Sequence, residues 1–307
     1  MILVNGCSFS APADDNYSWV SGFYDKNINP FEYGLSNTIM QYNVVRNVAV
    51  GGASNNVIRR KTFWYLNEEY NVQKPDYVII QWSTIDRWDY PVFVTKEKAE
   101  NFPRMDMFPE RIGRINYMNN GTDTFGYGKD FYEKYYSVYG AVIEALENIY
   151  HTQQYLEKAG IPYKMITIGN LFAMDTSIEK LIELQNTTPN KRGDYTELKT
   201  KSILEKLETY DSSWYELNNI NSLLRKIDFT KFLFTDDTNI SGFGGGIIEW
   251  FLNKNEPLTG GGHHPSAEQH KRFFNEFLWP KIEQDVIQYK AKVNGIIEQS
   301  IDKKLYI

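Results

Sequence analysis

The sequence predicts an α/β fold of three layers, in which a parallel sheet of about five strands lies between two layers of helices, as in flavodoxin-like proteins. Short apolar runs alternate along the chain with longer segments of helical periodicity. Some of these runs are continuously apolar, which is typical of parallel strands that are covered on both faces. Three of them end at glycine or asparagine, residues that favour turns.

The first strand is predicted at Ile2–Val4 and leads directly into Asn5-Gly6-Cys7-Ser8. In open α/β sheets, ligands bind beyond the carboxyl ends of the strands, so the Ser8 hydroxyl is a candidate functional group. The alternative is that Gly-Cys-Ser forms an ordinary strand-to-helix turn, with Ser8 as a helix cap and Cys7 as a small buried residue.

The remaining core elements follow in order along the chain. The β-branched run of residues 43–50 ends at Gly51-Gly52 and precedes a helix that is expected to reach Tyr70. Helical periodicity returns from Val138 to Leu156 and is stopped by Gly160 and Pro162. Three further strands are predicted, at Asp76–Trp82, Tyr163–Ile168 and, more briefly, Lys231–Phe234.

The closing helix begins with a capping box formed by Ser266 and Gln269, and its apolar face carries Phe273, Phe274 and Phe277. Two segments lack the regular pattern, at about 87–130 and 171–226, and we interpret both as insertions into one domain that spans residues 1–307. The glycine-rich stretch of residues 235–262 is expected to be a loop.

Composition excludes several classes of function. The formal net charge is −6 and the isoelectric point about 5.4, so the basic surface of a nucleic-acid-binding protein is not expected. One cysteine permits neither an intrachain disulfide nor a cysteine zinc cluster. No carboxylate stands at a convincing ligand spacing from His263 and His264, so we expect neither a metal nor another cofactor.

Three short motifs stand at the ends of predicted elements: Gly6-Cys7-Ser8-Phe9-Ser10 after the first strand, the block of residues 47–55 around Gly51-Gly52, and Gly262–Ser266 before the last helix. In this order they resemble the motifs of the SGNH/GDSL hydrolase family, especially its phage and bacterial variants. The resemblance implies that Ser8 is the nucleophile and His264 the general base. It also implies that the backbone N–H groups of Ser8 and Gly52 bind the oxyanion.

A fourth block, Gln81–Asp86 at the end of the third predicted strand, stands in the place of the family's third motif. This block and the segment before His264 each depart from the family pattern at one position. Ile85 stands where the family has an asparagine that donates to the oxyanion, and Asn55, Ser83 or Thr84 would have to replace it. Gly261 stands where the family has the acid partner of the histidine. Asp236, Asp237, Glu249 or a backbone carbonyl would then take that role.

Substrate contacts are predicted next to the third strand and the histidine. Trp82, Trp88 and Tyr90 form either a stacking platform for a sugar or part of the core. Asp86 and Arg87 either bind substrate or pair with each other at the surface, and His263 is a further candidate. His270, one turn into the closing helix, is expected to be structural.

These features predict a serine esterase or deacylase that acts on an O-acetylated carbohydrate or another small ester. The alternative is a catalytically impaired binding or structural module, for example a component of a viral particle. The first strand begins at residue 2 and no apolar run reaches the length of a membrane span, so we expect a cytoplasmic or virion-associated protein without signal peptide or membrane partner. The oligomeric state is left open.

Overall fold

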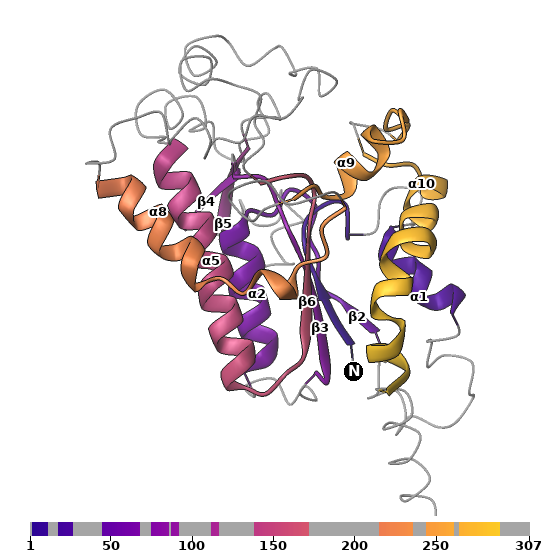
Figure 1. Cartoon of the computed structure of the whole chain (residues 1–307), viewed down its shortest axis with the longest axis horizontal. Coiled ribbons are helices and arrows are strands. Elements are labelled where there is room, and N and C mark those ends of the chain that lie inside the picture. The colour runs from indigo at the N-terminus through magenta and orange to yellow at the C-terminus, as the bar shows by residue number, and fades with distance from the viewer. Residues whose placement is uncertain are drawn as a thin grey trace, which may run out of the picture.

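The computed structural model describes residues 2–11, 18–26, 45–67, 75–85, 87–91, 112–116, 138–171, 215–235, 244–260 and 264–288 (Figure 1). Within these residues the core is an α/β arrangement, with helices on both sides of a parallel sheet. The predicted fold class is therefore confirmed at this level.

The sheet contains four described strands in the order β2-β1-β3-β6, and every neighbouring pair is parallel. Leu3 of β1 lies between Arg46 of β2 and Val78 of β3, so β1 is an interior strand. The bounds of the strands are β1 (Ile2–Asn5), β2 (Val45–Asn47), β3 (Tyr77–Trp82) and β6 (Tyr163–Thr167).

The fifth strand predicted at 231–234 is reduced to a single parallel bridge beside β6, with Leu233 N–H donating to Met165 O. Residues 229–231 form the 3-10 turn η6 (Phe229–Lys231), and only Phe232 forms a parallel bridge, to Met165 of β6. The side chain of Asp228 caps this turn by accepting a hydrogen bond from the Thr230 N–H. The cap favours the turn over an extended strand, because the Thr230 N–H is already satisfied by Asp228. In a strand this N–H would need an acceptor on the neighbouring strand.

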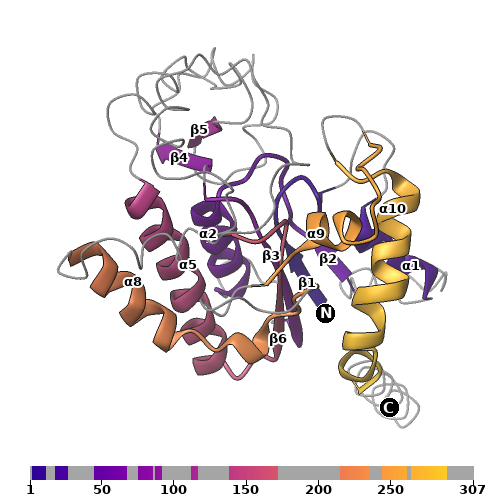
Figure 2. The same cartoon turned by 45° about the horizontal axis from the view of Figure 1, so that its top comes forward.

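Helices cover the sheet from two sides (Figures 1 and 2). On one side lie α2 (Asn55–Leu66), α5 (Val138–Lys158) and α8 (Tyr215–Lys226), with α5 between the other two. On the other side lie α1 (Gly22–Asp25), which follows the 3-10 turn η1 (Trp19–Ser21), and α10 (Ala267–Arg272).

The sequence signals explain where these helices begin and end. The Ser54 hydroxyl accepts a hydrogen bond from the Val57 N–H and caps α2. The turn after α5 contains Gly160 at a φ of 63°, a conformation that glycine adopts without strain. The apolar face of α5 is buried as its periodicity predicts, including Val142, Leu146, Ile149 and Leu156.

The closing helix continues beyond α10 through the π-helical segment η8 (Phe273–Leu278) to residue 288. Its predicted capping box is present, with the Ser266 hydroxyl accepting from the Gln269 N–H. Phe273 and Phe274 are fully buried, and Phe274 packs against Phe23 of α1 with ring centroids 5.0 Å apart. This aromatic contact joins the last helix of the core to the first.

Two regions predicted to be irregular contain regular structure. Within the first insertion, β4 (Arg87–Pro91) and β5 (Ile112–Asn116) form an antiparallel pair, which lies above α2 and α5 in Figure 2. The glycine-rich stretch contains the short helix α9 (Ile247–Leu252), which buries Ile247, Trp250 and Phe251. Burial of these large side chains outweighs the loop preference of the glycines around them.

In the part of the chain that the structure describes, no helix has the length and apolar character needed to cross a membrane.

Truncation of the aromatic contact between the terminal helices tests this packing. We expect Phe274→Ala to lower the free energy of unfolding by about 3–5 kcal/mol, because it removes a fully buried ring from a close-packed site. Ile287→Ala is the control, since its side chain is exposed and should change stability by less than about 0.5 kcal/mol. Urea denaturation of both variants gives the comparison. Equal midpoints would contradict the proposed role of Phe274.

Candidate active site

Ser8 lies at the point where the connections of the sheet diverge. The chain passes from β1 outward to β2 on one side, and continues from β3 to β6 on the other. In open α/β sheets the loops that leave the two sides of such a point separate and leave a crevice for ligands. Ser8 follows β1 at this place, as the sequence predicts, and it is partly exposed.

The turn that carries Ser8 is fixed to the sheet by backbone hydrogen bonds. Val48 N–H donates to Val4 O and Val50 N–H to Gly6 O, which continues the pairing beyond the ends of β1 and β2. Cys7 is fully buried, and its carbonyl accepts hydrogen bonds from the N–H groups of both Ser10 and Ala11. The backbone on each side of Ser8 is therefore held in place.

Ser10 anchors the same turn from inside the core. Its hydroxyl donates to Gln81 Oε1 on β3 and accepts from Trp19 Nε1 at 3.0 Å. Its carbonyl accepts from Asn47 Nδ2 at 2.7 Å and from the Ser18 hydroxyl at 3.0 Å. Ser10 is fully buried, so these bonds form away from water and tie the turn to two strands.

Ser8 and His264 are in direct contact although they are 256 residues apart in the chain: Ser8 Oγ lies 2.7 Å from His264 Nε2. In the tautomer with its proton on Nδ1, the imidazole accepts the serine hydrogen at Nε2. The ring of Phe9 packs on the imidazole, with centroids 4.9 Å apart at a 40° angle. The base is thus held both by a hydrogen bond and by an aromatic face.

The backbone of His264 is held by the segment that precedes it. Gly260 N–H donates to His264 O at 2.8 Å. A Cβ atom at position 260 would lie 2.6 Å from that same oxygen and 2.6 Å from Pro265 O, closer than side-chain carbons pack. Glycine at this position therefore allows the chain to close tightly before His264 enters the site.

The expected oxyanion-binding groups lie around the turn after β2. A Cβ atom on Gly51 would lie 3.9 Å from Ser8 Cβ, so Gly51 lies next to the serine. Gly52 has a φ of 76°, which favours glycine. Asn55 Oδ1 accepts from Ser83 N–H at 2.7 Å and its Nδ2 donates to Ser83 O at 3.1 Å, so its amide is held in one orientation. One Nδ2 hydrogen is used in this pair.

The end of β3 carries the unusual third motif. Ile85 is buried and has no polar group to donate. Ser83 Oγ and Thr84 Oγ1 are buried atoms without a hydrogen-bond partner within the described ranges. Unsatisfied buried hydroxyls are uncommon in folded proteins, so both remain candidates to donate to a ligand.

Of the residues predicted as acid partners of His264, the structure describes only Glu249. Asp236 and Asp237 lie outside the described residues. The Glu249 carboxylate accepts from Gly246 N–H at 2.7 Å and from Asn170 N–H at 2.9 Å. These contacts give Glu249 a structural role, in which it joins the start of α9 to the loop after β6.

The residues predicted to contact substrate also differ in where they lie in the structure. Trp82 is fully buried and its Nε1 donates to Met165 Sδ, so it is a core residue and its prediction as a substrate contact is wrong. Asp86 and His263 lie outside the described residues. Arg87 begins β4, and its buried Nε and Nη1 atoms have no hydrogen-bond partner among the described residues, so it stays a candidate. His270 is buried in α10, consistent with a structural role.

Within the described ranges, no group of three or more histidine, cysteine, aspartate or glutamate side chains is arranged to hold a metal ion.

Sequence reasoning missed the groups that support the serine turn. Three of these groups, Ser10, Asn47 and Gln81, lie within the motifs quoted above. Functional roles are predicted only for other residues of those motifs. The available signal is that polar residues interrupt apolar runs, because a buried polar side chain requires a partner.

Comparison with protein-family models, curated proteins and solved structures finds no match to this chain.

Removal of the Ser10 hydroxyl tests the anchoring of the turn. We expect Ser10→Ala to lower the free energy of unfolding by about 1–3 kcal/mol, because Trp19 Nε1 and Gln81 Oε1 lose their partner inside the core. Ser21→Ala is the matched control, since the Ser21 hydroxyl accepts only a long hydrogen bond from Ser18 N–H at 3.3 Å. Thermal denaturation compares the two variants. A smaller effect for Ser10→Ala than for Ser21→Ala would refute the anchoring role.

Proposed function

We propose that this protein is a serine hydrolase of the SGNH/GDSL type, which cleaves a carboxylic ester with Ser8 as nucleophile and His264 as general base. The observation that carries the proposal is the 2.7 Å contact between Ser8 Oγ and His264 Nε2 at the switch point of a parallel sheet. The motif resemblance points to the same two residues, Ser8 and His264.

The proposed reaction proceeds in two steps. Ser8 Oγ attacks the ester carbonyl carbon while His264 Nε2 takes the hydroxyl proton, and the imidazolium then returns that proton to the departing alcohol oxygen. Water next attacks the acyl-Ser8 carbonyl while His264 takes a proton from it. The acid leaves, and Ser8 recovers its proton from His264.

Each tetrahedral intermediate needs donors for its oxyanion. We assign this role to the backbone N–H groups of Ser8 and Gly52 and to the second Nδ2 hydrogen of Asn55. Supporting this assignment, Gly51 approaches Ser8, and the Asn55 amide is oriented in advance by Ser83. Preorganised donors stabilise the developing charge without reorganisation during the reaction.

The substrate we propose is an acylated carbohydrate or another small ester, with O-acetyl groups as the first choice. Arg87 and the hydroxyls of Ser83 and Thr84 support a polar substrate, because their buried polar atoms have no hydrogen-bond partner among the described residues. A polyol offers such groups both donors and acceptors.

A second candidate function is a catalytically impaired module that binds a glycan or protein, for example within a viral particle. Ile85 favours it, since a buried aliphatic side chain stands where the resemblance implies a donor. This candidate predicts that glycan binding, measured by calorimetry, is unchanged by Ser8→Ala while neither protein hydrolyses esters. Hydrolysis by the unmodified chain that disappears in the variant would exclude it.

Loss of the nucleophile or base tests the proposed chemistry. We expect Ser8→Ala and His264→Ala each to reduce kcat for short-chain aryl esters and acetylated glycans by at least about 10³-fold, because the two groups act as one unit. Ser21→Ala provides a control serine outside the site. Initial rates at several ester concentrations give kcat and KM. Equal rates for the unmodified chain and Ser8→Ala would contradict the proposal.

Replacement of the Asn55 amide tests the third oxyanion donor. Asn55→Asp keeps an oxygen for Ser83 N–H but removes the Nδ2 hydrogens, so we expect kcat to fall about 10²–10³-fold with little change in KM. Asn56→Asp, one position along α2, introduces the same charge as a control. An unchanged kcat in Asn55→Asp would assign the donor role to another group.

A further inference from the structure

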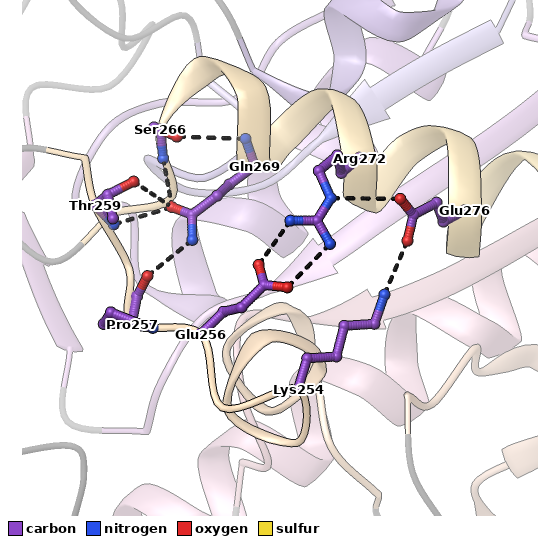
Figure 3. A network of polar contacts seen from close by, with 8 residues as sticks. All are labelled: Lys254, Glu256, Pro257, Thr259, Ser266, Gln269, Arg272 and Glu276. Atoms are coloured by element: carbon purple, nitrogen blue, oxygen red, sulfur yellow. Dashed lines mark hydrogen bonds and ion pairs between the residues drawn. The ribbon is translucent and has the colours of Figure 1, made fainter.

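The chain just before His264 is folded back onto the helix that follows it. Residues 257–260 and 264–269 lie side by side, joined by the hydrogen bond from Gly260 N–H to His264 O. One side chain, Gln269 of α10, spans both arms of this fold (Figure 3). It is buried, at 6 % exposure.

Gln269 uses both ends of its amide. Oε1 accepts hydrogen bonds from Thr259 N–H at 2.9 Å, from the Thr259 hydroxyl at 3.0 Å and from Ser266 N–H at 3.0 Å. Nε2 donates to Pro257 O at 2.9 Å. The capping box accounts only for the bond with Ser266, so the other three contacts serve the preceding arm.

A second layer holds the same arm from outside. Arg272, one turn further along α10, forms a bidentate pair with Glu256, at 2.7 Å and 3.0 Å. Glu276 joins this pair to Lys254, so the four charged side chains form one network (Figure 3). The hydrogen bonds from Arg272 hold the pKa of the Glu256 carboxyl below its ordinary value, so it is ionised at neutral pH.

We infer that Gln269 is the positioning residue of the proposed active site, which fixes the backbone on both sides of His264 and thereby sets Nε2 against Ser8. The inference rests on the proposed function for its kinetic consequence, but the geometric part stands without it. His264 has Pro265 and Ser266 on one side and is bonded to Gly260 on the other, and Gln269 contacts Ser266 and the residue before Gly260.

The expected effect is on the chemical step. General bases contribute about 10²–10⁴-fold to rate, and small displacements of a catalytic group lose part of that factor. We expect Gln269→Ala to reduce kcat about 10–100-fold and to change KM by less than about twofold, because Gln269 is buried and both ends of its amide already bond to the protein. Gln269→Glu keeps the oxygen acceptor and should recover most of the rate.

Gln153 offers a matched control in the same chain. Its buried amide also bonds both ways to the backbone of a loop, donating to Asp228 O and accepting from Asp228 N–H, each at 2.9 Å. Asp228 precedes η6, which lies beside the start of β6 and so at the edge of the sheet opposite to Ser8. Gln153→Ala should lose comparable stability and keep its kcat.

A readout independent of turnover is the nuclear magnetic resonance signal of the His264 ring nitrogens at fixed pH. With the ring held against Ser8, Ser8→Ala removes a hydrogen bond and should shift the Nε2 signal. In the Gln269→Ala background the same substitution should produce a much smaller shift, because the contact is weakened. In the Gln153→Ala background the shift should persist.

The outcomes separate the two proposals. A clear reduction of the Ser8-dependent shift in Gln269→Ala supports the positioning role even if no ester is hydrolysed, in which case only the proposed function fails. Persistence of that shift, or a kcat within twofold of that of Gln153→Ala, overturns the positioning role. If Gln269→Ala does not fold, Thr259→Val removes a single bond to Gln269 and should reduce both kcat and the shift several-fold. An unchanged kcat and an unchanged Ser8-dependent shift in Thr259→Val would then overturn the positioning role of Gln269.

Discussion

The central position of β1 is the constraint on which the candidate site depends. β1 pairs with β2 on one side and β3 on the other, and all four of its residues are buried. A shift of one residue in register would turn each of its side chains to the opposite face, which makes slippage costly. The turn that carries Ser8 begins where this strand ends, so the position of the strand also fixes the position of the serine.

Different kinds of interaction hold Ser8 and His264 in place. The serine turn is held by hydrogen bonds through Ser10, which is fully buried, and those to Gln81, Trp19 and Ser18 lie inside the core. The histidine is held by Gln269 and, further out, by ion pairs of Arg272 that are about one-third exposed. Surface ion pairs are weakened by salt, so the base side of the site is the more sensitive to solution conditions. The geometry at Ser8 is set by the core, and that at His264 by the last helix.

The sequence was sufficient for elements whose local and tertiary preferences agree. The buried strands at the start of the chain and at 163–167, the long helix α5 with its Gly160 stop, and the Ser266–Gln269 capping box are all found as predicted. The prediction failed where packing outweighed local preference. The glycine-rich stretch contains α9 because Trp250 and Phe251 are buried, and Trp82 belongs to the core because β3 is covered on both faces.

The candidate site was predictable in location but not in its supporting contacts. Ser8 and His264 stand at the ends of elements, where the topology of a parallel sheet brings residues together. The roles of Ser10 and Gln269 depend on which groups face them in the folded chain, and no local pattern records that. Gln269 has a local signature, the capping box, that explains one of its four hydrogen bonds.

Covalent labelling decides whether Ser8 is an activated nucleophile, as the proposed function requires. The unmodified protein is incubated with a fluorophosphonate, and the adduct is located by mass spectrometry of its peptides. We expect a single adduct on Ser8, and we expect His264→Asn to slow its formation by at least about tenfold because the hydroxyl loses its base. A failure of Ser8 to label, or labelling at an unchanged rate in His264→Asn, would contradict the proposed function.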